Sequence, residues 1–69
     1  MKFEIDDQTE EFSLGFAVGT LMRMAANPAR QQLERDCARR AAGVILTKMG
    51  KAQRLGMKLL FPDLKALKP

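Results

Sequence analysis

Few side chains in this sequence could carry out catalysis. It has no histidine, tyrosine or tryptophan and a single cysteine, Cys37, so a nucleophile with its base and a zinc-binding set are both missing. Cys37 stands between Leu33 and Ala41 at helical spacing, which predicts a buried and unreactive thiol. The acidic residues before position 12 could pair as carboxylates, but nothing around them would divide them into an acid and a base.

Residues 15–19 begin and end with glycine, yet they lack the Gly-Lys-Ser/Thr ending and the preceding strand of a phosphate-binding loop. We therefore expect a protein that is not an enzyme and that holds no cofactor or metal.

Binding is the chemistry that the charged residues favour. Arginine is preferred where a planar guanidinium binds carboxylates or phosphates at an interface. Four arginines fall close together and form the predicted partner-binding surface: Arg30, Arg35, Arg39 and Arg40. The alternative is a solvated charged face, because Glu34 and Asp36 each lie four residues from an arginine and could pair with it.

A second basic run alternates with apolar residues nearer the C-terminus. It consists of Lys48, Lys51, Arg54 and Lys58, interleaved with Leu55, Met57, Leu59, Leu60 and Phe61. This pattern is typical of a basic amphipathic helix that meets a membrane surface or an acidic partner. The alternative is that these cations only stabilise the C-terminus of a helix.

Length and charge limit the architecture that must position these residues. A chain of 69 residues forms one domain, and a core of this size rarely supplies more than about 3–5 kcal/mol without a staple. One cysteine cannot form a disulfide within the chain, and a hydrophobic fraction of 46% leaves apolar surface to cover, so self-association is the remaining source of extra stability. Residues 1–34 carry a net charge of −3 and residues 35–69 one of +7, so an acidic head and a basic tail could also pair within a dimer.

The first helix is expected over residues 9–26. Residues 1–8 are expected to form an arm before this helix. Charged and apolar side chains alternate at residues 2–6, a pattern that would also suit a short strand. Asp7 and Glu10 have the spacing of a helix cap. Gly15 and Gly19 lie four residues apart, which would let another helix approach closely.

Asn27-Pro28 predicts a sharp turn and the start of the second helix, over residues 28–49. The second helix either ends at Gly50 or continues past it as far as residue 61. Residues 62–69 are expected to form a loose tail or one short turn.

The second helix carries two apolar stripes, one through Leu33, Cys37, Ala41 and Val44 and the other through Ala38, Ala42, Ile45 and Met49. One stripe can meet the first helix and the other a second subunit. The predicted fold is therefore all-α, an antiparallel helical hairpin completed by homodimerisation. The expected dimer or core residues are Phe12, Phe16, Leu21, Leu33, Cys37, Ala41, Val44 and Ile45. The surface that completes the dimer could instead capture the partner.

The free thiol and the acidic start, unlike a secretory signal, predict a cytoplasmic protein. The longest uncharged stretch, Phe12 to Met22, is shorter than the roughly 20 residues that cross a bilayer, so we expect no membrane span.

Nucleic-acid binding is the rival function. A strand followed by two helices is the order of dimeric ribbon-helix-helix repressors. Here the reading face of the strand would present Lys2, Glu4 and Asp6, and carboxylates are repelled by phosphates. A small dimeric DNA- or RNA-binding regulator is therefore the less favoured alternative.

The chain length, the two-helix plan hinged at Ala26-Asn27-Pro28 and the arginine just after the hinge, Arg30, together resemble one known family. These are small phage-encoded quorum-sensing anti-activators of Pseudomonas, helical-hairpin dimers that bind LuxR-type regulators. Some also bind the ATPase that drives type IV pilus assembly. The resemblance implies an inhibitor of a bacterial host protein that acts in the host cytoplasm, with Arg30 as a partner contact.

Overall fold

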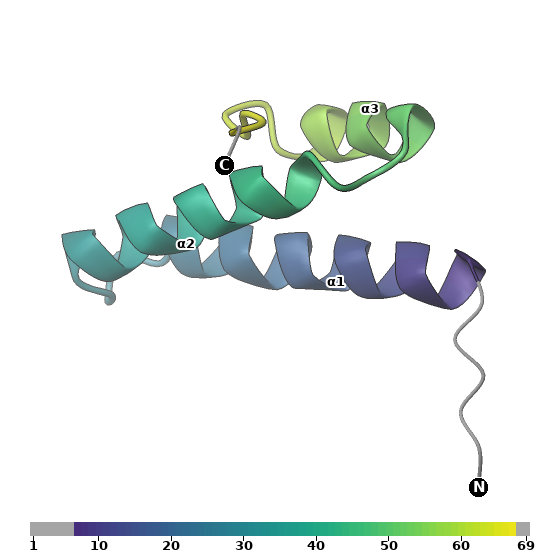
Figure 1. Ribbon diagram of the computed structural model, residues 1–69. Helices are drawn as coiled ribbons and strands as arrows, with labels where there is room; N and C mark the ends of the chain where they lie inside the picture. The colour runs from purple at the N-terminus through teal and green to yellow at the C-terminus, as the bar shows by residue number, and fades with distance from the viewer. Residues whose placement is uncertain (1–6, 68–69) are drawn as a thin grey trace, which may run out of the picture.

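The computed structural model describes the backbone of residues 7–67 and the side chains of residues 10–67. This part of the chain forms three α-helices, α1 (Asp7–Ala26), α2 (Gln32–Leu46) and α3 (Lys51–Leu60), and contains no strand (Figure 1). The predicted all-α class is confirmed, with three helices where two were expected. Residues 1–6 of the predicted arm over residues 1–8 lie outside the described residues, whereas residues 7 and 8 belong to α1 instead of the arm. The side chains of residues 7–9, where the helix cap was predicted, are also outside the description.

α1 begins two residues earlier than expected and ends at the predicted Ala26. Its buried side is formed by Val18, Met22 and Ala25, which follow one another at the three- and four-residue spacing of a helix face. The other sides of α1 carry the two phenylalanines, Phe12 and Phe16, which are exposed. Within one copy of the protein, therefore, only one of the apolar sides of α1 is buried.

The connection between α1 and α2 spans residues 27–31. The Asn27 side-chain Oδ1 accepts a hydrogen bond of 3.0 Å from the Ala29 amide, and the Asn27 carbonyl accepts one of 3.1 Å from the Arg30 amide. Asn27 therefore closes a turn around Pro28, and α2 begins four residues later, after Gln31. The sharp turn is present, but the prediction that helix two starts at residue 28 is wrong.

α2 packs along α1 through small side chains (Figure 1). Ala38 and Ala42 are buried on the α2 side and Ala25 on the α1 side, so the two backbones approach closely at an alanine seam. Leu46 and Met49 continue the buried row toward α3. Of the two stripes predicted on helix two, the one through Ala38 and Ala42 is the stripe that meets α1.

α2 ends at Leu46 because its last carbonyl groups find partners outside the helix. The carbonyls of Val44, Ile45 and Leu46 accept hydrogen bonds from the amides three residues on, and the Thr47 hydroxyl also donates to Val44 at 2.6 Å. The chain then turns, and Gly50 stands at the N-cap of α3 in an extended conformation. Residues 47–50 thus separate two helices that the sequence allowed to be one.

The segment after α3 folds back over α2, and Figure 1 shows it above that helix. Leu64 is 3% exposed and belongs to the core cluster, and the Leu67 amide donates a hydrogen bond of 3.1 Å to the Gly43 carbonyl. A side chain at Gly43 would overlap the Lys65 carbonyl oxygen, so the close crossing requires glycine. Of the two predictions for the tail, the short turn is present at residues 62–63, where the Leu64 amide donates a hydrogen bond of 2.9 Å to the Phe61 carbonyl. Residues 62–67 are docked instead of loose, because Leu64 adds apolar burial that a free tail would lose. No helix within residues 7–67 is both long enough and apolar enough to cross a bilayer.

Candidate interaction surfaces

The four predicted partner-binding arginines do not form one surface. Arg35 is half-buried, and its Nε donates a hydrogen bond of 2.8 Å to the Ala25 carbonyl at the end of α1. This contact satisfies a carbonyl that the helix leaves open and ties the start of α2 to the end of α1. Arg35 is therefore occupied by the fold.

Two of the other arginines are held in exposed ion pairs. Arg30 lies 3.3 Å from Glu34, as the predicted alternative allowed, and Arg39 lies 3.7 Å from both Asp36 and Asp63. Exposed pairs of this kind contribute about 0–1 kcal/mol each, so a partner could replace them at little cost.

Arg40 is exposed and forms no ion pair with any residue that the structure describes. Arg40 lines a shallow hollow at the place where the C-terminal segment crosses α2. The other residues that line this hollow are Asp36, Arg39, Asp63, Lys65 and Leu67. In place of the Asp36–Arg40 pair that the spacing allowed, Asp36 accepts a hydrogen bond of 2.8 Å from the Gln32 side-chain amide and lies in the ion pair with Arg39. Of the four predicted partner-binding arginines, Arg40 is thus the one whose guanidinium makes no ion pair or hydrogen bond with a described residue.

The second apolar stripe of α2 lies beside the contact with α1 and is mostly exposed. Leu33 is 73% exposed, Cys37 and Ala41 are exposed, and Val44 is partly buried. The predicted burial of Cys37 is therefore wrong for the single chain, because the alanine stripe beside it takes the place against α1. We call these four residues and Arg40, which lies among them on the helix, the outer face of α2.

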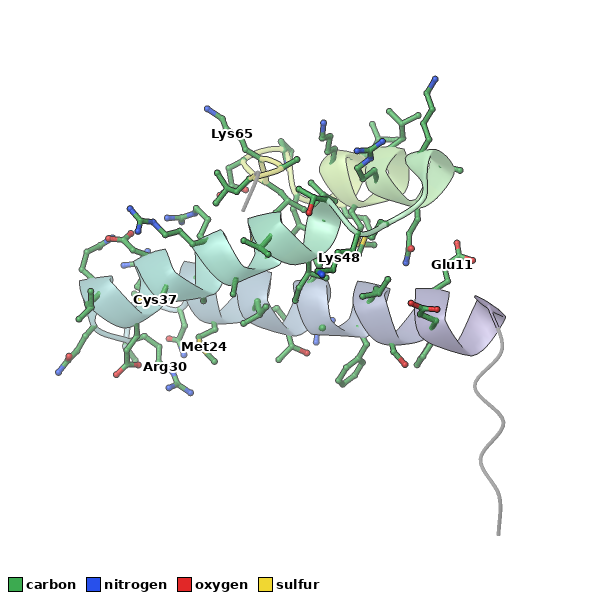
Figure 2. The ribbon with its side chains drawn as sticks, viewed as in Figure 1. Glu11, Met24, Arg30, Cys37, Lys48 and Lys65 are labelled. Atoms are coloured by element: carbon green, nitrogen blue, oxygen red, sulfur yellow. The ribbon has the colours of Figure 1, made fainter. Side chains whose placement is uncertain are left out.

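A shallow groove runs between α1 and α2 next to this face. Leu21 and Met24 line it from α1, and Cys37 and Ala41 line it from α2. Figure 2 shows Met24, Cys37 and Arg30 gathered at this end of the molecule. Of the predicted dimer or core residues, Leu21 and Ile45 pack against the core as partly buried neighbours.

The outer face of α1 carries a pair of phenylalanines. The rings of Phe12 and Phe16 stack with their centroids 6.5 Å apart and an interplanar angle of 23°. Phe12 is 74% exposed and Phe16 is 67% exposed, and nothing lies within 4 Å of the position that a side chain at Gly19 would take. Two exposed aromatic rings beside an open glycine form a second apolar surface without a partner in the chain.

The acidic head and the basic tail meet within one chain. Glu11 and Lys48 line a shallow cavity between α1 and the start of α3, and Figure 2 shows both near this junction. The Gln53 side-chain amide donates a hydrogen bond of 2.6 Å to the Glu11 carbonyl. A side chain at Gly15 would lie 3.3 Å from the Gln53 side-chain nitrogen, whereas one at Gly19 would meet nothing within 4 Å. Of the two glycines predicted to let another helix approach, only Gly15 has a neighbour in the single chain.

α3 carries three of the four cations of the second basic run, while Lys48 lies in the turn before the helix. The half-buried side of α3 consists of Gln53, Arg54, Gly56 and Met57. Leu55, Leu59 and Leu60 are 57%, 83% and 68% exposed, and Lys51 and Lys58 are exposed as well. This arrangement leaves most of the apolar side of an amphipathic helix in contact with solvent.

Sequence reasoning did not single out Gln53, Gly43 or Leu64, which hold α3 and the C-terminal segment in place. Each acts through a contact with a residue far away in the chain, and the periodicity of apolar residues along the sequence does not predict contacts of this kind. No protein-family model, curated protein or solved structure matches this chain.

Proposed function

We propose that this chain is a small non-enzymatic protein that binds another protein and modulates its activity. The observation that carries the proposal is the outer face of α2, where Leu33, Cys37 and Val44 form an apolar stripe and Arg40, which makes no ion pair with a described residue, lies on the same side of the helix. Arginine is one of the residue types enriched in the energetic hot spots of protein interfaces, and apolar contacts around such an anchor exclude water from it.

The proposal includes a homodimer in which two helical hairpins associate through the outer face of α1. The stacked pair of Phe12 and Phe16 supports this assignment, because aromatic surface of this kind is covered in most stable proteins. The outer faces of α1 and α2 lie on different helices, and each is mostly exposed. Dimerisation and partner binding then use separate surfaces.

The kind of partner follows from the resemblance to phage-encoded anti-activators. It extends the proposal to inhibition of a LuxR-type quorum-sensing regulator in the cytoplasm of a bacterial host, and to the type IV pilus assembly ATPase as a second target. Inhibition by covering a surface requires only complementary shape and a few anchor residues, which the outer face of α2 offers.

The test of partner binding is direct titration of a purified LuxR-type regulator with the wild-type chain and with Arg40→Glu. Because Arg40 forms no ion pair with a described residue, the reversal should weaken binding by about 2 kcal/mol or more without loss of helicity. Arg23→Glu is the matched control, since Arg23 is an exposed arginine of α1. Equal binding by the wild type and both variants would show that the outer face of α2 is not the interface.

The test of self-association is the molar mass by light scattering. The wild type should have the mass of a dimer at micromolar concentration, and the Phe12→Ser/Phe16→Ser variant that of a monomer with unchanged helicity. Leu33→Ser, on α2, should remain dimeric. A wild-type chain that is folded and monomeric would contradict the dimer.

Nucleic-acid binding is the second candidate, and one observation favours it. No acidic residue occurs between Asp36 and Asp63, so this stretch carries only positive charge. Binding to generic duplex DNA that falls steeply with added salt would support this function, and no binding at low salt would exclude it.

A further inference from the structure

The outer side of α3 is an apolar ridge bordered by cations. Leu55 lies four residues after Lys51 and three before Lys58, so both ammonium groups flank it on the helix surface. Leu59 lies one turn further along and is the most exposed large hydrophobic residue of the described chain, at 83%. In Figure 2 the side chains on this side of α3 point away from α1 and α2.

The cations of α3 form a row beside the leucines. Lys51, Arg54 and Lys58 follow each other at spacings of three and four residues, which places them along one side of the helix. No acidic residue lies within α3 or in the segments that adjoin it from residue 37 to residue 62. Across the junction with α1, Lys51 shares a shallow cavity with Glu10 and Glu11, but no ion pair joins the cations of this row to any residue that the structure describes.

We propose that α3 is an interfacial helix that lies on an anionic lipid surface, with Leu55 and Leu59 inserted between the acyl chains and the cations at the level of the headgroups. Leucines on one side and lysines beside them are the composition of helices that bind in the plane of a membrane. Long lysine side chains bury their methylene stems beside the leucines while their ammonium groups reach the lipid phosphates.

The shape of the surface favours a lipid layer over a macromolecular partner. Leu59 projects from the molecule, and Leu55 lies beside it in a shallow hollow formed by Lys51, Arg54 and Lys58. A projecting leucine next to cations fits a lipid layer, whose acyl chains can close around the side chain. A nucleic acid would use the cations and leave the leucines in water. This surface is also separate from the outer faces of α1 and α2, so the inference does not depend on the proposed function.

The first experiment is sedimentation of the full chain with vesicles at low ionic strength. We expect binding to vesicles of equimolar phosphatidylcholine and phosphatidylglycerol, much weaker binding to phosphatidylcholine alone, and release by added salt. Lys51→Gln/Lys58→Gln should lower the affinity by roughly thirtyfold, since each cation near an anionic leaflet contributes about fivefold. Arg23→Gln, on α1, is the control for charge and should bind like the wild type.

The leucines are tested in the same assay. Leu55→Gln/Leu59→Gln should lower the affinity for the anionic vesicles by about tenfold or more, because the inserted apolar area is lost. Leu33→Gln is the matched control, an exposed leucine on α2 with acidic neighbours, and should leave the affinity unchanged. All of these residues are exposed, so circular dichroism should show the same helicity in each variant.

Insertion itself is tested with a fluorescent reporter. The chain has no tryptophan, so Leu59→Trp provides a single indole, which should shift its emission to the blue on anionic vesicles and be quenched by brominated lipid. Leu33→Trp should do neither.

Three results would overturn the proposal. The first is that the wild-type chain does not bind anionic vesicles. The second is that Lys51→Gln/Lys58→Gln loses affinity for the vesicles while Leu55→Gln/Leu59→Gln binds as tightly as the wild type. The third is that Leu55→Gln/Leu59→Gln has half the molar mass of the wild type in solution. The last would show that a second copy of the chain covers this ridge.

Discussion

The backbone amide of Leu67 donates a hydrogen bond to the carbonyl oxygen of Gly43, across the surface of α2. This bond satisfies a carbonyl near the end of the helix that has lost its place in the helical ladder, and it holds the C-terminal segment over the core. The absence of a side chain at residue 43 allows the crossing.

Gly43→Ala should destabilise the protein by about 1–3 kcal/mol, because the new methyl group would displace the Lys65 carbonyl and the segment behind it. Urea denaturation followed by circular dichroism measures the change. Gly19→Ala is the control within a helix, where the methyl group meets open space and alanine should add up to about 1 kcal/mol. Two glycines that respond alike would mean that the crossing is not present in solution.

Leu64→Ala tests the contribution of the C-terminal segment to the core. Leu64 is almost fully buried, so its truncation should cost about 2–4 kcal/mol of unfolding free energy. Leu60→Ala removes an equal volume from a side chain that is 68% exposed and should change the stability by less than about 0.5 kcal/mol. Equal effects would contradict the docking of the segment.

Arg35→Met should lower the stability by about 1–2 kcal/mol, because the Ala25 carbonyl loses its charged donor while the apolar stem of the side chain is kept. Arg40→Met should be close to neutral for folding, since Arg40 makes no ion pair with a described residue. Thermal unfolding of the two variants separates a structural arginine from a binding one. The reverse order of stabilities would contradict both assignments.

Cys37 reports on the outer face of α2. Its thiol is exposed, so the native protein should react with a thiol reagent at a rate within about tenfold of the rate in urea. The rate should not fall as the protein concentration rises if the dimer forms through α1, and it should fall when the protein partner is added. Protection that increases with concentration would place the dimer contact on α2.

The sequence predicted the helices better than the way they meet. Helical periodicity and the Asn27-Pro28 break are local signals, and they gave the all-α class and the turn. On helix two, however, the stripes through Leu33 and through Ala38 are both apolar, and periodicity alone cannot decide which one faces α1. The smaller residues are buried because they let the two backbones approach, and this advantage appears only when both helices are present.

The remaining differences have the same origin. Leu64 is a single apolar residue between Asp63 and Lys65, and one residue forms no periodic pattern. Arg35 was grouped with the other arginines by its position in the chain, but the contact that occupies it comes from α1. For the candidate surfaces, the sequence provided the residue types, and the packing determined which of them stay exposed.

The alanine seam between α1 and α2 has a consequence for how this protein can change over generations. Ala25, Ala38 and Ala42 admit little besides other very small residues, because anything larger would push the helices apart. The outer faces of the same helices carry no such restriction. Selection can therefore retune which molecules the protein recognises, one surface at a time, while three alanines keep the scaffold the same.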